Sequence, residues 1–165
     1  MKSAHDNPEM RAADKFDNSF EIALPVTEAW RVLTDIPRIA SYLPGAELTE
    51  VMDGASYKGR ISVPLGPVSF AFDGVAKIDE IDADNHTAHI TAKGVDAKGR
   101  GEAVGSISFE LCPSGDGSKV LVRTDLALSG AVAEFGRNVG IIRGSAERII
   151  TKFADNLRTQ IPKWP

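Results

Sequence analysis

Few side chains in this sequence have the types and spacing that catalysis or metal binding needs. His86 and His89 are three residues apart, and on a β-strand this spacing sends two side chains to opposite faces, so they cannot hold one metal ion together. Cys112 is the single cysteine, it precedes a proline, and it has no basic neighbour in the sequence. We therefore expect a small buried apolar side chain there, not a nucleophile, and no internal disulfide.

Four carboxylates come close together in the sequence at Asp79, Glu80, Asp82 and Asp84. Paired carboxylates exchange protons with a substrate only where a cleft removes them from water. These four lie at the tip of a predicted hairpin, which solvent normally reaches, so they are interpreted as a charged loop. Neither the carboxylates nor the histidines predict an enzyme.

Small residues occupy the middle of the faces that the predicted strands turn inward. Side chains alternate between the two faces of a strand, and charged residues such as Lys58 and Asp73 mark the faces that contact water. The opposite rows are Tyr57-Gly59-Ile61-Val63, Phe70-Phe72-Gly74-Ala76, Ile90-Ala92-Gly94 and Ala103-Gly105-Ile107-Phe109. Two interpretations stay open. Either the glycines let the sheet bend and pack closely against a helix, or they surround an apolar ligand cavity.

The elements that carry these rows follow from periodicity and turn residues. A first strand is predicted over 16–24, then a short helix over 28–34 with Thr27 as its N-cap, then a second short helix that begins near Pro37 and ends at Pro44-Gly45. Six further strands are predicted over 46–52, 57–65, 68–81, 86–98, 101–111 and 120–128, and the short breaks between them favour antiparallel hairpins.

A long helix is predicted over 131–161, with apolar residues at helical spacing on one side. Such a helix needs a concave partner, and the antiparallel sheet is the candidate. We therefore predict an α+β helix-grip fold, in which a curved antiparallel sheet wraps around the long C-terminal helix, with two short helices after the first strand. The chain of 165 residues is interpreted as one domain, residues 16–165, after a disordered leader, residues 1–15.

The composition narrows the class of partner and the compartment. The formal net charge is −4 and there is no cluster of Lys and Arg, which argues against binding to nucleic acid. No apolar run approaches the roughly 20 residues that span a bilayer, and the N-terminus lacks the apolar core of a signal peptide. With a single cysteine, these features predict a cytoplasmic protein.

Two features of the long helix require an explanation. Gly136, Gly140 and Gly144 form a ridge beside the apolar stripe, and a glycine costs about 1 kcal/mol relative to alanine inside a helix. Close approach to the sheet, room for a flat ring, or contact with a partner protein would each compensate. Arg143 lies at the edge of the stripe, where it either extends its head into water or donates a hydrogen bond to a ligand carbonyl at the cavity mouth.

Several short motifs together resemble the CoxG family of carbon monoxide dehydrogenase accessory proteins, in the same order along the chain. They are Thr27-Glu28-Ala29-Trp30, Leu33-Thr34-Asp35, Tyr42-Leu43-Pro44-Gly45-Ala46-Glu47-Leu48, Gly66-Pro67-Val68, Phe72-Asp73-Gly74, Gly99-Arg100-Gly101 with Ala103 and Gly105, Ser129-Gly130, and Phe135-Gly136-Arg137. The resemblance covers residues 16–160 and implies a START-like ligand-binding domain of the SRPBCC superfamily.

The resemblance also implies a function. It is that of a non-catalytic accessory protein without a covalently bound cofactor, which binds a lipophilic small molecule, a respiratory quinone, in an apolar cavity. Its implied partners are the catalytic subunits of a CO dehydrogenase-type molybdenum hydroxylase, which it would link to the membrane electron-transport chain. Peripheral contact with the inner face of the plasma membrane is implied too, although this sequence ends at Lys163-Trp164-Pro165 without the C-terminal extension of some members.

The expected pocket combines the inward rows, the long helix and a rim loop. Its lining is Tyr42, Leu43, Tyr57, Phe70, Phe72, Gly74, Ile90, Gly105, Phe109, Phe135, Val139, Ile142 and Arg143. Tyr42 and Leu43 would cover the opening with Gly45 as a hinge, and leucine at Gly74 or Gly105 should fill the cavity without disturbing the fold. Two other functions stay open. One is an adaptor that docks the dehydrogenase through exposed apolar positions such as Ile141 and through the glycine ridge. The other is a cyclase-like or hydrolase-like enzyme.

Overall fold

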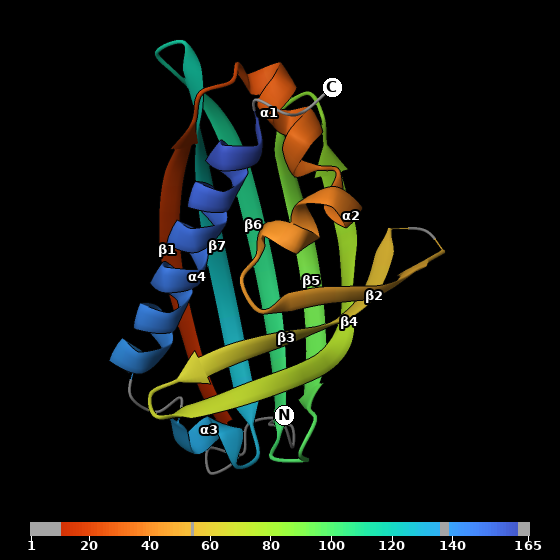
Figure 1. Ribbon diagram of the computed structural model, residues 1–165, viewed down its shortest axis with the longest axis vertical. Helices are drawn as coiled ribbons and strands as arrows, with labels where there is room; N and C mark the ends of the chain where they lie inside the picture. Colours follow the sequence, from red (N-terminus) through yellow and green to blue (C-terminus); the bar gives the residue numbers. More distant parts are fainter. Residues whose placement is uncertain (1–10, 54, 136–138, 162–165) are drawn as a thin grey trace, which may run out of the picture.

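Seven strands form one antiparallel sheet in the computed structural model, which describes residues 11–53, 55–135 and 139–161. The strands are β1 (Arg11–Ile22), β2 (Ala46–Met52), β3 (Ser56–Leu65), β4 (Val68–Asp82), β5 (Thr87–Asp96), β6 (Glu102–Ser114) and β7 (Gly117–Ser129). Their order in the sheet is β1-β7-β6-β5-β4-β3-β2, so β1 pairs with β7 at one edge. The sheet is strongly curved: β1, β7, β6 and β5 run lengthwise, and β2 and β3 cross in front of them (Figure 1).

The helices lie on the concave side of the sheet. After β1 come α1 (Val26–Leu33), α2 (Ile36–Ile39) and the 3₁₀ helix η3 (Ala40–Tyr42), and after β7 come α3 (Val132–Phe135) and α4 (Val139–Gln160). α4 runs along β1, α1 covers one end of β6 and β7, and α3 lies at the opposite end of the molecule (Figure 1). The predicted helix-grip arrangement is confirmed.

Three predicted boundaries differ from the structure. β1 begins at Arg11, so residues 11–15 belong to the sheet and not to a leader, while residues 1–10 lie outside the described residues. α1 begins at Val26 because the Pro25 carbonyl already accepts the first helical hydrogen bond, from the Ala29 N–H at 2.9 Å, so Thr27 is not the N-cap. The single helix predicted over 131–161 is wrong, since α3 and α4 are separate elements that point in different directions (Figure 1).

The buried apolar side chains form two clusters at opposite ends of the concave face. The α1-end cluster joins α1, α2 and the second half of α4 to β1, β6 and β7, through residues such as Phe20, Leu33, Leu111, Phe153 and Leu157. The α3-end cluster joins α3 and the first half of α4 to β3, β4 and β7, and consists of Leu65, Phe70, Phe72, Leu128, Val132, Ala133 and Ile142. Each long strand therefore passes from one cluster to the other.

Candidate functional site

A belt of inward-facing residues crosses the sheet between the two clusters. Its two rows are Ile78-Ile90-Ile107-Thr124 and Tyr57-Ala76-Ala92-Gly105, each formed by direct partners on neighbouring strands. None of these residues belongs to either cluster, and all except Gly105 are only half-buried. The rows of small residues predicted from alternation therefore meet in register, and the apolar side chains beside them stay partly uncovered.

The glycines of the predicted cavity have two different roles. A Cβ on Gly105 would have Ile107 Cδ1 as its one neighbour, 3.6 Å away, so a side chain there would enter the belt. A Cβ on Gly74 would overlap the carbonyl oxygen of Lys93 and lie 2.7 Å from the Cα of Gly94. Gly74 is thus required by the close approach of β4 and β5. The expectation that leucine at Gly74 would leave the fold intact is wrong.

Most of the predicted aromatic lining belongs to the core. Phe70 stacks on Phe72 with ring centroids 6.2 Å apart and meets the edge of Phe135 at 5.2 Å, all within or against the α3-end cluster. Ile142 is 3% exposed in the same cluster. These side chains already fill the end of the concave face, so they border the belt and do not surround a cavity. The side chain of Val139 lies outside the described residues.

The predicted gate is a fixed part of the fold. Tyr42 and Leu43 are half-buried against the α1-end cluster, and Asn156 of α4 donates a hydrogen bond to the Tyr42 carbonyl at 2.8 Å. Gly45 has φ of +80°, and its carbonyl accepts the Ser62 N–H at 2.9 Å. These contacts tie the loop to α4 and to β3, so they favour a rim over a hinge.

Arg143 is bound to the edge of the sheet. Its Nε lies 3.4 Å from Asp14 Oδ2, and its Nη2 donates to the Lys15 carbonyl at 3.4 Å. The Asp14 side chain is 10% exposed, whereas that of Arg143 is 58% exposed. The guanidinium therefore anchors α4 to β1 from outside, and this position does not suit a donor to a ligand in the belt.

The rest of the predicted ridge divides between open space and core. A Cβ on Gly144 would meet nothing within 4 Å, so close approach to the sheet does not explain this glycine. Gly136 lies outside the described residues. Ile141, expected as an exposed docking position, is half-buried and packs against the α3-end cluster. Room for a ring or for a partner remains as the explanation of Gly144.

Asn18 is an inward residue that the sequence interpretation did not single out. It lies on β1 between Phe16 and Phe20 and pairs with Val122 of β7, so it sits beside the belt at the boundary of the clusters. Within the described part of the chain, its Oδ1 is the one buried side-chain oxygen or nitrogen without a hydrogen-bond partner. The signal was present, because alternation along the first strand puts a polar residue into an apolar row.

The Gly99-Arg100-Gly101 motif forms a lock at the turn between β5 and β6. Asp96 has no exposed side-chain surface, and its Oδ2 accepts the Arg100 Nε at 2.7 Å and the N–H groups of Arg100 and Lys98. The Arg100 guanidinium also lies 4.2 Å from the ring centroid of Phe70, and the Arg100 carbonyl accepts the Val132 N–H. The hydrogen bond from the Arg100 side chain is the main reason why the pKa of Asp96 falls to about 2. The motif is therefore structural.

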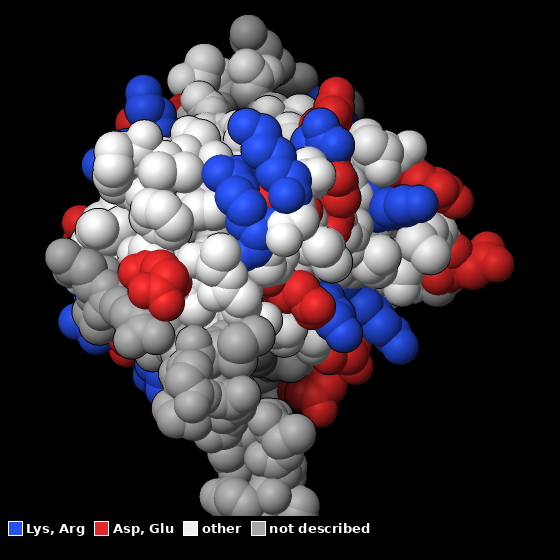
Figure 2. Space-filling model, turned by 90° about the horizontal axis from the view of Figure 1, so that it is seen from below, with Lys and Arg blue, Asp and Glu red and all other residues white. Residues whose placement is uncertain are grey.

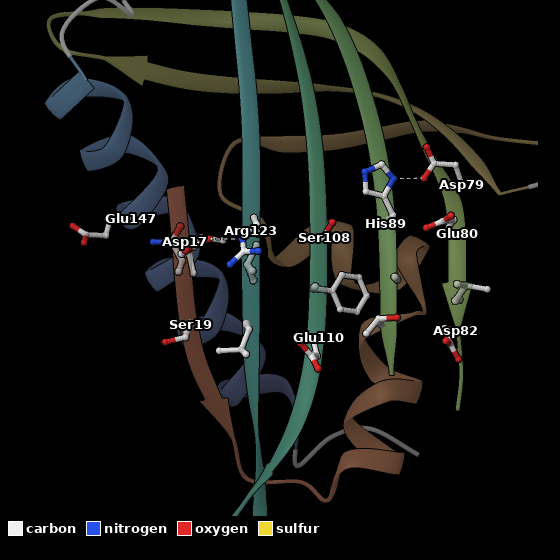
Figure 3. Close-up of a pocket in the computed structure, with 18 of the residues that line it drawn as sticks. Asp17, Ser19, Asp79, Glu80, Asp82, His89, Ser108, Glu110, Arg123 and Glu147 are labelled. Atoms are coloured by element: carbon white, nitrogen blue, oxygen red, sulfur yellow. Dashed lines mark hydrogen bonds and ion pairs between the residues drawn. The ribbon is translucent and has the colours of Figure 1, made fainter. Parts of the chain in front are cut away.

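A broad open hollow has a different chemistry from the predicted apolar cavity. Its lining is largely polar and includes Asp17, Ser19, His89, Ser108, Glu110 and Arg123, together with exposed positions of α4. These side chains spread over one face of neighbouring strands, with Arg123 paired to Asp17 at 3.0 Å and His89 to Asp79 at 2.5 Å (Figure 3). Such a surface suits water and charged groups, so the belt remains the candidate for an apolar ligand.

Asp79, His89 and Ser106 are connected in the order of a nucleophilic triad. His89 Nδ1 lies 2.5 Å from Asp79 Oδ1, and His89 Nε2 lies 2.6 Å from Ser106 Oγ. Thr91 donates to the other oxygen of Asp79 at 2.5 Å, and this bond, followed by that of His89, lowers the pKa of Asp79. Sequence analysis missed the group because a β-bulge between Ile78 and Glu80 sets which way Asp79 points.

The surroundings of Ser106 do not suit acyl transfer. Serine catalysis needs N–H donors aimed at the developing oxyanion. Ser106 lies in the interior strand β6, paired with Thr91 on one side and Asp125 on the other, so the backbone there is engaged in the sheet. We interpret the three residues as a polar network that joins β4, β5 and β6.

The remaining predictions on metals, charge and membranes can be compared with the structure. His86 lies against the Trp30 ring, with centroids 5.5 Å apart, whereas His89 faces Asp79, and the described residues hold no group of three metal-binding side chains. Acidic and basic side chains are interspersed on the end of the molecule seen in Figure 2. Among the described helices, none is both long and apolar enough to span a membrane.

Solved structures with the same architecture come from proteins of different kinds. A conserved protein from Geobacillus kaustophilus has a TM-score of 0.75 and 22% identity, covering 91% of this chain and 96% of its own. The ZhuI aromatase/cyclase from Streptomyces sp. R1128 has a TM-score of 0.60 and 13% identity, with 92% and 95% covered. Truncated norcoclaurine synthase from Thalictrum flavum has a TM-score of 0.58 and 14% identity, with 94% and 98% covered. At these identities the likeness establishes the START-like helix-grip fold alone.

The sequence itself identifies the family. No curated protein sequence matches the chain significantly. The sequence model of the carbon monoxide dehydrogenase CoxG family, however, matches residues 19–162, which include β2 to β7, all the helices and most of β1. The chain therefore belongs to the carbon monoxide dehydrogenase CoxG family.

Proposed function

We propose that this protein is a non-catalytic accessory protein that holds a lipophilic small molecule, a respiratory quinone, against the belt. The observation that carries the proposal is the division of the core: apolar residues in the middle of a concave face stay half-exposed between two packed clusters. Apolar surface left uncovered in a concavity is the usual property of a site for an apolar ligand. A flat ring would rest on the small row, where Ala76, Ala92 and Gly105 leave room above the backbone.

Membership of the CoxG family supports the proposed partner. A carbon monoxide dehydrogenase passes electrons onward, and a quinone is a lipophilic carrier of electrons and protons. We infer that the protein serves a CO dehydrogenase-type molybdenum hydroxylase by bringing quinone from the membrane to it, from the cytoplasmic side. The catalytic subunits would do the chemistry, and this chain would supply a place to bind the carrier.

The test begins with what the protein carries. An organic extract of gently purified protein, analysed by mass spectrometry beside the native mass of the chain, should contain a near-stoichiometric quinone. Protein that is empty should take up menadione in a calorimetric titration. Empty protein that also refuses menadione and longer-chain quinones would contradict the proposal.

Gly105→Leu should abolish this binding while the protein stays folded. The new side chain would project into the belt, where the first neighbour of its Cβ is the end of one flexible side chain, Ile107. We expect at least a tenfold loss of menadione affinity by calorimetry. Val104→Leu is the matched control, because Val104 precedes Gly105 on the same strand but is 40% exposed on the opposite face. Equal affinity in both variants would exclude the belt as the site.

An adaptor without a small ligand is the second candidate, and the outer face favours it. Val75, Val95 and Val104 lie on neighbouring strands with exposures of 39%, 49% and 40%. Exposed valines on adjacent strands form a surface that another protein can cover. An adaptor would bind the dehydrogenase subunits with an empty belt, and Val95→Lys would release them. A carrier would keep its ligand in that variant.

A further inference from the structure

Asn18 is placed where a buried polar group has no protein partner. Its Oδ1 is fully buried and accepts no hydrogen bond, although the residue as a whole is half-buried and borders the open hollow that also touches Gly144 and Ile150. A buried acceptor without a donor costs stability, so such a group calls for an explanation. The neighbours of Asn18 along β1 are Phe16 and Phe20, which cannot supply a hydrogen bond.

Space for a ligand lies next to this side chain. A Cβ on Gly144 would meet nothing within 4 Å, and Thr124 of the belt lies one step away on the partner strand β7. Asn18 therefore sits at the end of the belt, beneath α4, where an apolar molecule in the belt would bring its polar end. The other described polar groups buried in the core already have partners. Ser145 donates to the Pro64 carbonyl, Ser118 to the Leu24 carbonyl, and Asp96 binds Arg100.

We propose that Asn18 is the polar anchor of the bound molecule, and that it sets a preference for ligands with a carbonyl or hydroxyl oxygen at one end of a flat apolar ring. This inference rests on the proposed function. An amide carries a donor and an acceptor at the two ends of one group, and the torsion that exchanges them is broad and nearly two-fold. Because no protein partner holds Oδ1, the amide can turn its NH₂ toward a ligand carbonyl or its oxygen toward a ligand hydroxyl. Both redox forms of a quinone would then find a partner.

The test compares two probes of similar shape on the full chain. Menadione has two carbonyl oxygens, and methylnaphthalene has the same fused rings and methyl group with none. Asn18→Leu keeps the approximate size of the side chain and removes its polar atoms. We expect it to weaken menadione binding about tenfold in a calorimetric titration, the loss expected for one buried hydrogen bond, and to leave methylnaphthalene binding unchanged or tighter.

A second readout separates an anchor from a structural residue. If Asn18 waits for a ligand, Asn18→Leu should raise the melting temperature of the empty protein, because an unpaired buried acceptor disappears. Ser145→Ala is the control: it removes a buried group that has its partner, so it should lower the melting temperature and leave the ratio of the two affinities unchanged.

The outcomes distinguish this inference from the function on which it rests. If wild-type protein binds both probes, Gly105→Leu loses both, and Asn18→Leu leaves their ratio unchanged, the anchor is overturned and the carrier function stands. A lower melting temperature for empty Asn18→Leu would equally overturn the anchor. If the wild type binds neither probe, the carrier function and the anchor both fail.

Discussion

Gly74→Ala is expected to destabilise the protein by about 3 kcal/mol, at the upper end of the cost of overpacking. The added Cβ would overlap the Lys93 carbonyl oxygen and press on the Cα of Gly94, and both are backbone atoms in the centre of the sheet. β4 and β5 would have to separate where ten cross-strand pairs hold them together. A domain with a typical stability of about 5–15 kcal/mol would lose a large part of it, which urea unfolding followed by circular dichroism would measure.

Gly105→Ala is the control for this result. Gly105 has the same alternation and belongs to the same kind of row, but its Cβ would have one flexible neighbour at 3.6 Å. Since alanine also restricts the unfolded chain more than glycine, the variant should be as stable as the wild type or slightly more so. Equal losses at both positions would contradict the assignment of Gly74 to strand contact and of Gly105 to open space.

Arg100→Met is expected to have the second large effect. Methionine keeps an unbranched apolar stem beside Phe70 but leaves the carboxylate of Asp96, which has no exposed side-chain surface, without its guanidinium. A buried charge that loses its partner destabilises far more than an exposed one, because water cannot replace the partner. The urea midpoint should fall clearly. In the control Arg60→Met it should hardly move, since Arg60 and Asp73 form a pair of similar length, 2.6 Å, with both side chains about half exposed.

The same pair predicts a pH dependence with a definite sign. The pKa of Asp96 is lowered to about 2 in the folded protein, so its ionised form stabilises the fold above the ordinary carboxyl pKa near 3.8. This contribution is lost as the pH falls from about 4 toward 2. In Arg100→Met the carboxyl protonates more easily, so the difference in unfolding free energy between variant and wild type should shrink over this range. A difference that stays constant from pH 5 to pH 2.5 would contradict the lock.

The strands could be predicted from the sequence because each has a strict two-residue alternation and ends at clear turn residues. β2 was predicted with its actual bounds, and the predicted β3 and β4 each differ from the structure by one residue at one end. The family motifs were also readable, because their order survives across the chain. The N-cap at Thr27 was wrong, since a side-chain preference is weak against a backbone that has already turned at Pro25.

The details of the site could not be predicted, since they depend on contacts between distant residues. Gly74 and Gly105 occupy equivalent places in their strand patterns, and only the approach of a neighbouring backbone separates them. Arg143 has the helical position of a ligand donor, but Asp14 at the far end of the chain binds it. Asn18, in contrast, was within reach, because an inward polar residue between two phenylalanines is visible in the sequence alone.

The division of the core also bears on how the molecule opens. Strands β4 to β7 are packed at both ends and uncovered in the middle, which is the reverse of an ordinary sheet, where central amide hydrogens exchange with solvent last. In the empty protein we expect the amides of the belt to exchange early and the two ends to unfold as separate cooperative units. A bound molecule would fill that weak centre and join the two units into one. Loading with cargo would then be felt over the whole chain as a single, sharper unfolding transition.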